Sequence, residues 1–108
     1  MTIELHPENS GTSRSVRISD LTTVRLPENP TTGYRWQLDS GDARLKLVED
    51  RFEGAGTLPG AGGERVLVFE AVRAGSARLR LAKRRSWEKG KPVEEFSVEL
   101  IVQPQVSA

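Results

Sequence analysis

Apolar side chains along this chain recur at every second position, and this alternation constrains the fold more than any other feature of the sequence. The segment 94–103 is the clearest case. Its apolar residues of one parity are Phe96, Val98, Leu100 and Val102. Successive side chains of a β-strand point to opposite faces, so this spacing is typical of a strand with one face against a core. Apolar residues at helical spacing are scarce in the sequence.

Clusters of Gly, Pro, Asp and Asn separate the alternating segments and mark turns. The sequence therefore predicts strands over residues 2–18 (broken), 21–27, 34–39, 44–53, 65–73, 76–84 and 94–103. About seven short strands in 108 residues predict an all-β, immunoglobulin-like antiparallel β-sandwich. The length suits a single domain over residues 1–108. Trp36 alternates with polar residues in its strand, which predicts a core position.

The composition narrows the classes of function. The chain has no cysteine, which excludes disulfides and thiol catalysis. His6 is the single histidine and lacks the local signature of a Ser-His-Asp triad, and no cluster of residues has the spacing of a metal site. The net charge of +1 gives no argument for nucleic acid, and no apolar run approaches the ~20 residues of a membrane span. We therefore expect a chain that is not an enzyme, with no cofactor, no metal, and no nucleic acid or membrane partner. The expected oligomeric state is a monomer, although nothing in the composition fixes it.

The N-terminal residues lack a charged leader followed by an apolar stretch, so we expect no signal peptide in this chain. The absence of cysteine leaves the redox compartment undetermined. Two localisations therefore stay open: cytoplasmic, or periplasmic or secreted if a leader was removed.

Three loops between the predicted strands stand out. We call them the Asn-Pro loop (residues 29–34), the Gly-rich loop (residues 54–63) and the Trp loop (residues 83–92). Each follows a strand of the same direction if neighbouring strands reverse, so all three are expected at one end of the sandwich. Function usually lies on loops that a rigid scaffold holds.

The Asn-Pro loop has the residues of a preorganised turn. Pro30 fixes φ, and Asn29 can bond its own backbone two residues on. Gly33 can supply a positive φ that closes the turn, so the hydroxyls of Thr31 and Thr32 are expected at its tip. Alone, the hexapeptide more often marks only a good turn.

The other two loops have residues suited to contact with a partner. Five glycines in the Gly-rich loop permit close approach of a partner's backbone, although a floppy connector is equally consistent with them. The Trp loop has five positive charges and one negative charge around Trp87. A Trp in a polar loop is typical of an interface anchor, and the alternative is a lid on the core.

Together, the three loops resemble those of the chagasin family of cysteine-protease inhibitors. That family has an Asn-Pro-Thr-Thr-Gly-aromatic loop, a Gly-x-Gly-Gly segment and an Arg-Pro-Trp element on an immunoglobulin-like sandwich. The first is intact at residues 29–34 and the second at residues 60–63. The third matches at Arg85 and Trp87, but Ser86 replaces the proline and removes its restriction on φ.

The resemblance implies a reversible inhibitor of papain-like cysteine proteases, with the three loops acting as a wedge in the active-site cleft. Thr31 and Thr32 would sit over the catalytic cysteine, and the other loops would grip the two sides. The implied protease-binding residues are Asn29, Pro30, Thr31, Thr32, Gly33, Tyr34, Gly60, Ala61, Gly62, Gly63, Arg85 and Trp87.

A function of a different class is also consistent with these residues. An immunoglobulin-like adhesion or ligand-binding module could use Arg84, Arg85 and Trp87 to engage an acidic or sugar partner. Sandwich folds host many functions, so the fold cannot decide between the two. Salt can, because binding to a basic patch weakens steeply with salt and a cleft wedge weakens little.

Overall fold

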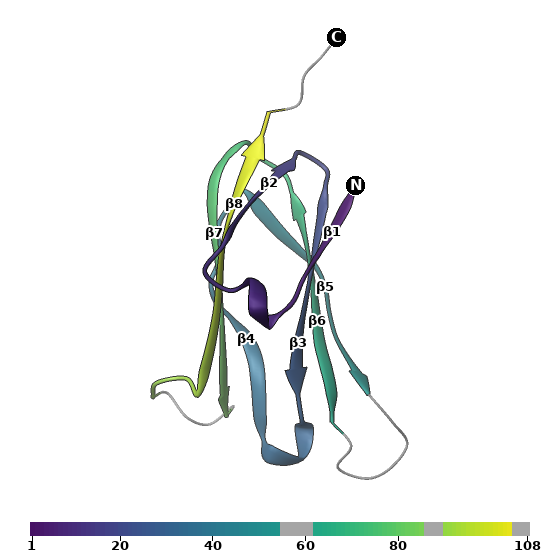
Figure 1. The fold of residues 1–108 in the computed structure, drawn as a ribbon, viewed down its shortest axis with the longest axis vertical. Coiled ribbons are helices and arrows are strands. Elements are labelled where there is room, and N and C mark those ends of the chain that lie inside the picture. Colours follow the sequence, from purple (N-terminus) through teal and green to yellow (C-terminus); the bar gives the residue numbers. More distant parts are fainter. Residues whose placement is uncertain (55–61, 86–89, 105–108) are drawn as a thin grey trace.

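The fold is a sandwich of two β-sheets (Figure 1). The computed structural model describes residues 1–54, 62–85 and 90–104. The described elements in chain order are β1 (Thr2–Leu5), the 3-10 turn η1 (Pro7–Asn9), β2 (Ser13–Arg17), β3 (Leu21–Glu28), the 3-10 turn η2 (Pro30–Thr32), β4 (Tyr34–Ser40), β5 (Leu45–Gly54), β6 (Gly63–Ala71), β7 (Gly75–Arg85) and β8 (Glu94–Gln103). The predicted all-β class is confirmed.

The first sheet has the strand order β1-β3-β6-β5, and the second has the order β2-β8-β7-β4. Antiparallel pairing joins β3 to β6, β5 to β6, β4 to β7 and β7 to β8, as predicted for an antiparallel sandwich. Each sheet adds one parallel pair at an edge, β1 with β3 and β2 with β8. Alternation of side chains does not distinguish these two kinds of pairing, since both have period two.

The broken segment 2–18 becomes two edge strands, one in each sheet. Pro7 begins the turn between them, where its fixed φ suits a 3-10 turn and its missing N–H leaves no donor unpaired. The His6 N–H donates to Asn9 Oδ1 at 2.8 Å and steadies that turn. Gly11, at φ +84°, then donates its N–H to Ser97 O at 2.7 Å, which begins the approach to β8.

The core lies between the two sheets. Its buried members are Leu5, Val16, Val24, Leu26, Trp36, Leu67, Phe69, Ala71, Leu79, Leu81, Phe96, Val98, Leu100 and Val102. Trp36 is 3% exposed, which confirms its predicted core position. Leu38 has the same parity, yet it is 39% exposed. It lies on the edge strand β4, where the pairing with β7 shifts register immediately after Leu38, so neighbours cover it less completely.

The central strand β6 is buried on both faces beside the Gly-rich loop. By parity Val66 and Val68 point away from the core, yet they are 0% and 7% exposed. Val66 pairs with Arg25 on one neighbouring strand and Arg51 on the other, and the aliphatic parts of long cationic side chains can cover apolar surface.

Hydrogen bonds from Arg51 and, to a smaller extent, from Arg25 lower the pKa of Glu53. The stability that these bonds add is therefore lost as the pH falls through that lowered pKa.

The described ends of the three loops lie at one end of the sandwich, as the alternation of strand direction predicts. Strands β3, β5 and β7 all run toward the lower end in Figure 1, while Met1 lies toward the upper end. The register agrees, because Gly63 pairs with both Glu28 and Gly54, and Tyr34 pairs with Arg85. The strand ends that flank the three loops are therefore neighbours in space.

Candidate functional site

The Asn-Pro loop folds as a turn that its own side chains hold. Asn29 Oδ1 accepts from the Thr31 N–H at 3.1 Å and from the Thr31 hydroxyl at 2.7 Å. Asn29 O accepts from the Thr32 N–H at 3.1 Å and from the Thr32 hydroxyl at 2.8 Å. The predicted bond from Asn29 to the backbone two residues on is therefore confirmed. Both threonines stay exposed, so a partner can reach the tip of the turn.

Gly33 closes the turn in the left-handed region, at φ 81° and ψ −6°, as the sequence predicts. Its N–H donates to Pro30 O at 3.1 Å. Tyr34 then begins β4, and its N–H donates to Thr32 Oγ1 at 3.3 Å. The turn therefore has internal hydrogen bonds from its first residue to the residue that leaves it, and little backbone freedom is left to lose on binding.

Two predicted site residues from different loops meet on neighbouring strands. Tyr34 begins β4 and Arg85 ends β7, directly opposite one another in the register. The Arg85 guanidinium lies 4.7 Å from the centroid of the Tyr34 ring, in the range of a cation–π contact. The start of the Trp loop is thereby fixed against the end of the Asn-Pro loop. Trp87 itself lies outside the described residues.

The end of the Gly-rich loop lies against the start of the Asn-Pro loop. A Cβ built on Gly62 would lie 3.8 Å from the Asn29 side chain, and Gly63 pairs with Glu28 in the sheet. Gly62 has φ +73°, a conformation that glycine adopts without strain. Gly60 and Ala61 lie outside the described residues, so the structure places only half of this predicted segment.

Gly63 and Gly62 differ sharply in the space around them, which yields a stability prediction. A Cβ on Gly63 would lie 2.0 Å from Glu53 O and 2.8 Å from the Phe52 ring. Because the first obstacle is backbone, we expect Gly63→Ala to lower the unfolding free energy by about 2 kcal/mol, as overpacking does. Gly62→Ala meets only ordinary contacts and should lower it by about 1 kcal/mol, from backbone strain alone. Urea denaturation measures both, and equal losses would contradict a steric role for Gly63.

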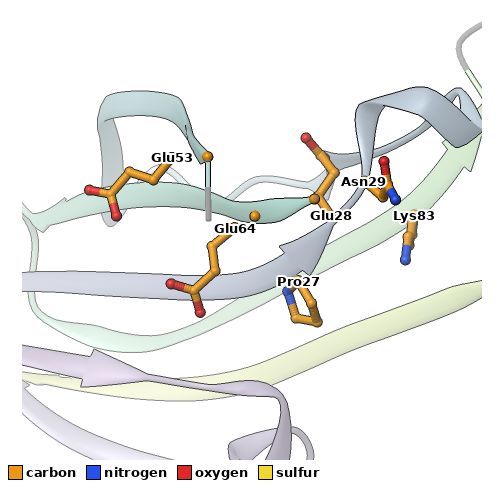
Figure 2. Close-up of a pocket in the computed structure, with 9 residues that line it drawn as sticks. Pro27, Glu28, Asn29, Glu53, Glu64 and Lys83 are labelled. Carbon is orange, nitrogen blue, oxygen red and sulfur yellow. The ribbon is translucent and has the colours of Figure 1, made fainter. Parts of the chain in front are cut away.

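A hollow of about 520 Å³ lies between the strand ends that flank the three loops, which we call the stems of the loops (Figure 2). Glu53 and Glu64, from β5 and β6, lie on one side of it, and Asn29 and Lys83 lie on the other. The residues that line it are Pro27, Glu28, Asn29, Glu53, Gly54, Gly62, Gly63, Glu64 and Lys83. The three stems therefore surround a common recess with charged walls.

A buried ion pair lies beneath the Asn-Pro loop. Glu28, 3% exposed, accepts from the Trp36 N–H at 2.7 Å through Oε1. Its Oε2 accepts from Arg65 Nε at 3.1 Å and Nη2 at 2.8 Å. Burial alone would lower the pKa of Arg65, but the hydrogen bond and charge of Glu28, with Asp50, outweigh burial and raise it. Arg65 therefore keeps its positive charge beside Glu28, and the contacts of the two residues link β3, β4 and β6.

Neither Glu28 nor Arg65 is among the site residues that the sequence motifs predict. One signal was present, since Arg65 has the same parity as Leu67 and Phe69 in a strand whose inner face is apolar. A charge at a core-facing position implies a buried partner. Glu28 has no comparable signal, because it stands at the end of its strand beside a turn.

The described ranges 1–54, 62–85 and 90–104 contain neither a candidate metal site nor a helix that could span a membrane. No group of three or more His, Cys, Asp or Glu residues there is arranged to hold a metal ion. No helix in those ranges has the length and apolar character that crossing a membrane requires. The described geometry at this end of the sandwich is an exposed turn that its own hydrogen bonds hold.

Comparisons with known proteins identify the family. The model of the "Chagasin family peptidase inhibitor I42" matches residues 15–102. Chagasin of Trypanosoma cruzi is 29% identical over 85 residues, which cover 73% of this chain and 77% of chagasin. Amoebiasin-2 of Entamoeba histolytica is 25% identical over 91 residues, which cover 81% of this chain and 74% of the relative.

A solved structure agrees on the fold. The crystal structure of EhICP2, a cysteine protease inhibitor from Entamoeba histolytica, superposes with a TM-score of 0.86, covering 94% of this chain and 96% of that one at 21% identity. The expected immunoglobulin-like sandwich and the resemblance drawn from the loop motifs are confirmed. The expectation that the chain is not an enzyme is confirmed too, because the matched family consists of inhibitors. This chain belongs to the chagasin family of peptidase inhibitors.

Proposed function

We propose that this chain is a reversible inhibitor of papain-like cysteine proteases and blocks their active-site cleft with the three loops at one end of the sandwich. The observation that carries the proposal is the exposed, internally hydrogen-bonded turn at residues 29–33, in a chain of an inhibitor family. The structurally similar protein EhICP2, described as a cysteine protease inhibitor, is consistent with this proposal.

The proposed mechanism is steric blockade by a preformed surface. The exposed Thr31 and Thr32 enter the cleft over the catalytic cysteine, and little conformational entropy is lost because the turn is already ordered. A turn closed by Gly33 and held by its own hydrogen bonds does not offer an extended peptide bond for cleavage. The chain therefore occupies the cleft without being a substrate.

The proposed protease-binding residues come from all three loops. The described ones are Asn29, Pro30, Thr31, Thr32, Gly33, Tyr34, Gly62, Gly63 and Arg85. Gly60, Ala61 and Trp87 are proposed from the sequence motif alone. The described members support one contact edge, because Gly62 lies against Asn29 and Arg85 stacks on Tyr34.

Titration of papain and of a cathepsin L-type enzyme tests the function. We expect full loss of activity at micromolar inhibitor or below, with the inhibitor chain intact on a gel after long incubation. A serine protease assayed in parallel should keep its activity, because the proposed fit is to a papain-like cleft. Unchanged activity of several papain-like enzymes at micromolar inhibitor would refute the proposal.

The adhesion-module alternative loses support from the described arginines. Arg84 donates to Asp39 Oδ1 at 2.9 Å and to Gly90 O at 3.2 Å, and Arg85 stacks on Tyr34. These cations are engaged within the chain instead of forming a basic patch for an outside anion. We therefore expect inhibition to change less than about threefold between low and physiological salt, because screening acts mainly on exposed charges. A steep, log-linear loss of inhibition with added salt would favour the alternative.

A further inference from the structure

The two stems of the Asn-Pro loop belong to different sheets. Strand β3 pairs with β1 and β6 in the first sheet, and β4 pairs with β7 in the second. No ladder hydrogen bond joins β3 to β4 in the part of the chain that the structure describes. An ordinary hairpin fixes its turn by pairing the two strands that enter and leave it. Here other contacts must fix the turn relative to the sandwich.

Side-chain hydrogen bonds replace the missing ladder. Glu28 Oε1 accepts the Trp36 N–H at 2.7 Å, and Pro27 O accepts the Trp36 indole N–H at 2.9 Å. Both contacts join the stem that enters the loop to the stem that leaves it. Glu28 directly precedes Asn29, the residue that organises the turn. A change in the Glu28 carboxylate would therefore be transmitted to the base of the turn.

Arg65 holds that carboxylate in its orientation. Its guanidinium bonds Glu28 Oε2 through two nitrogens and Asp50 Oδ1 through the third, at 3.2 Å, so it ties the carboxylate to β5 and β6. Its Cζ lies 5.9 Å from the Phe52 ring centroid, and the residue is 8% exposed. Buried ion pairs seldom stabilise a fold more than well-packed apolar residues do, because desolvation opposes the attraction. Stability alone therefore does not account for this pair beneath the loop.

We propose that Glu28 and Arg65 are positioning residues for inhibition, which set where the turn at residues 29–33 stands relative to the other two loops. The inference rests on the proposed function. This role requires no contact between either residue and the protease, because both residues are buried and act through Trp36 and Asn29. Their loss should misplace a turn that stays folded, and displacements of about 1 Å can cost up to 100-fold where geometry is demanding.

A double variant separates positioning from stability. In Glu28→Gln/Arg65→Met, glutamine keeps an oxygen for the Trp36 N–H, methionine replaces the arginine stem, and no unpaired charge is buried. We expect a melting temperature within a few degrees of the parent and inhibition of papain that is about tenfold weaker. In the free protein, the Trp36 amide, whose bond to Glu28 Oε1 joins the two strands that flank the loop, should exchange with solvent faster than in the parent. The Thr32 and Gly33 amides, whose bonds lie inside the turn, should keep the rates of the parent.

Arg44→Met is the matched control. It removes an arginine that pairs with Asp42 at 3.1 Å near Gly75, at the end of the sandwich away from the loops. Its inhibition of papain should equal that of the parent. If the double variant does not fold, Arg65→Lys takes its place, because lysine keeps a cation beside Glu28 but cannot bond both carboxylates in a fork. Inhibition about threefold weaker is expected from it, at an unchanged melting temperature.

A folded double variant, or a folded Arg65→Lys variant, that inhibits as well as the parent would overturn the positioning role. Weaker inhibition that only follows the unfolded fraction would overturn it too. A parent that inhibits no papain-like enzyme would instead refute the proposed function. Amide exchange in the free protein then decides the positioning role, and unchanged exchange at Trp36 would refute it.

Discussion

Replacing Trp36 with alanine is expected to lower the free energy of unfolding by about 3–5 kcal/mol, as large aromatic truncations in cores do. Trp36 lies between the sheets at 3% exposure, so alanine leaves a cavity that rigid strands cannot fill. The change also removes the indole N–H that Pro27 O accepts at 2.9 Å. Urea denaturation followed by circular dichroism measures the loss.

Trp36→Phe separates the two contributions. Phenylalanine keeps most of the apolar ring and lacks the donor for Pro27 O, so the expected loss is about 1–2 kcal/mol. Equal losses for the two variants would assign the whole effect to the hydrogen bond. A Trp36→Ala variant as stable as the parent would contradict the core position of Trp36.

Asn29→Ala is expected to weaken protease inhibition by about 30- to 100-fold, the range of a hot-spot truncation. Asn29 Oδ1 accepts two hydrogen bonds from Thr31, so alanine frees the residues proposed to enter the cleft. Ordering the turn on binding then costs free energy, which weakens inhibition. The unfolding free energy should fall by only about 1 kcal/mol, the usual effect of losing a capping residue. Inhibition constants and melting curves on the same preparations give both numbers.

Asn9→Ala supplies the control for that experiment. Its side chain also accepts a backbone N–H at a 3-10 turn, from His6 at 2.8 Å, but it lies outside the three loops. We expect a similar small loss of stability and an unchanged inhibition constant. If the two asparagine variants inhibit equally well, the internal bonds of the Asn-Pro loop do not contribute to binding.

Periodicity predicted the strands well and their partners poorly. The expected strand 94–103 matches β8 at both ends, and 34–39 falls one residue short of β4. Alternation could not assign each strand to a sheet, because it reports only which side chains share a face. The segment 2–18 shows this limit, since its two halves lie in different sheets. Alternation also places Val66 and Val68 on the face of β6 away from the core, yet both are buried.

The candidate site was predictable where local chemistry determines it. The Asn29 bonds and the positive φ of Gly33 follow from the residues themselves, and the structure has both. The ion pair of Glu28 and Arg65 joins residues 37 positions apart, so no local pattern could pair them. Long-range side-chain partners depend on sheet order, which a single sequence leaves open.

The parallel pairing of β2 with β8 has a kinetic consequence. Ser13 and Glu99, 86 positions apart in the chain, meet as neighbours in this pair. During synthesis, β2 can reach its place only after residue 103 has left the ribosome. Strand pairs closed over such separations fold slowly, in about milliseconds to seconds. Until then β2 has an unpaired edge that other nascent chains can join. The yield of active inhibitor is therefore expected to depend on whether β2 pairs with β8 faster than nascent chains associate with one another.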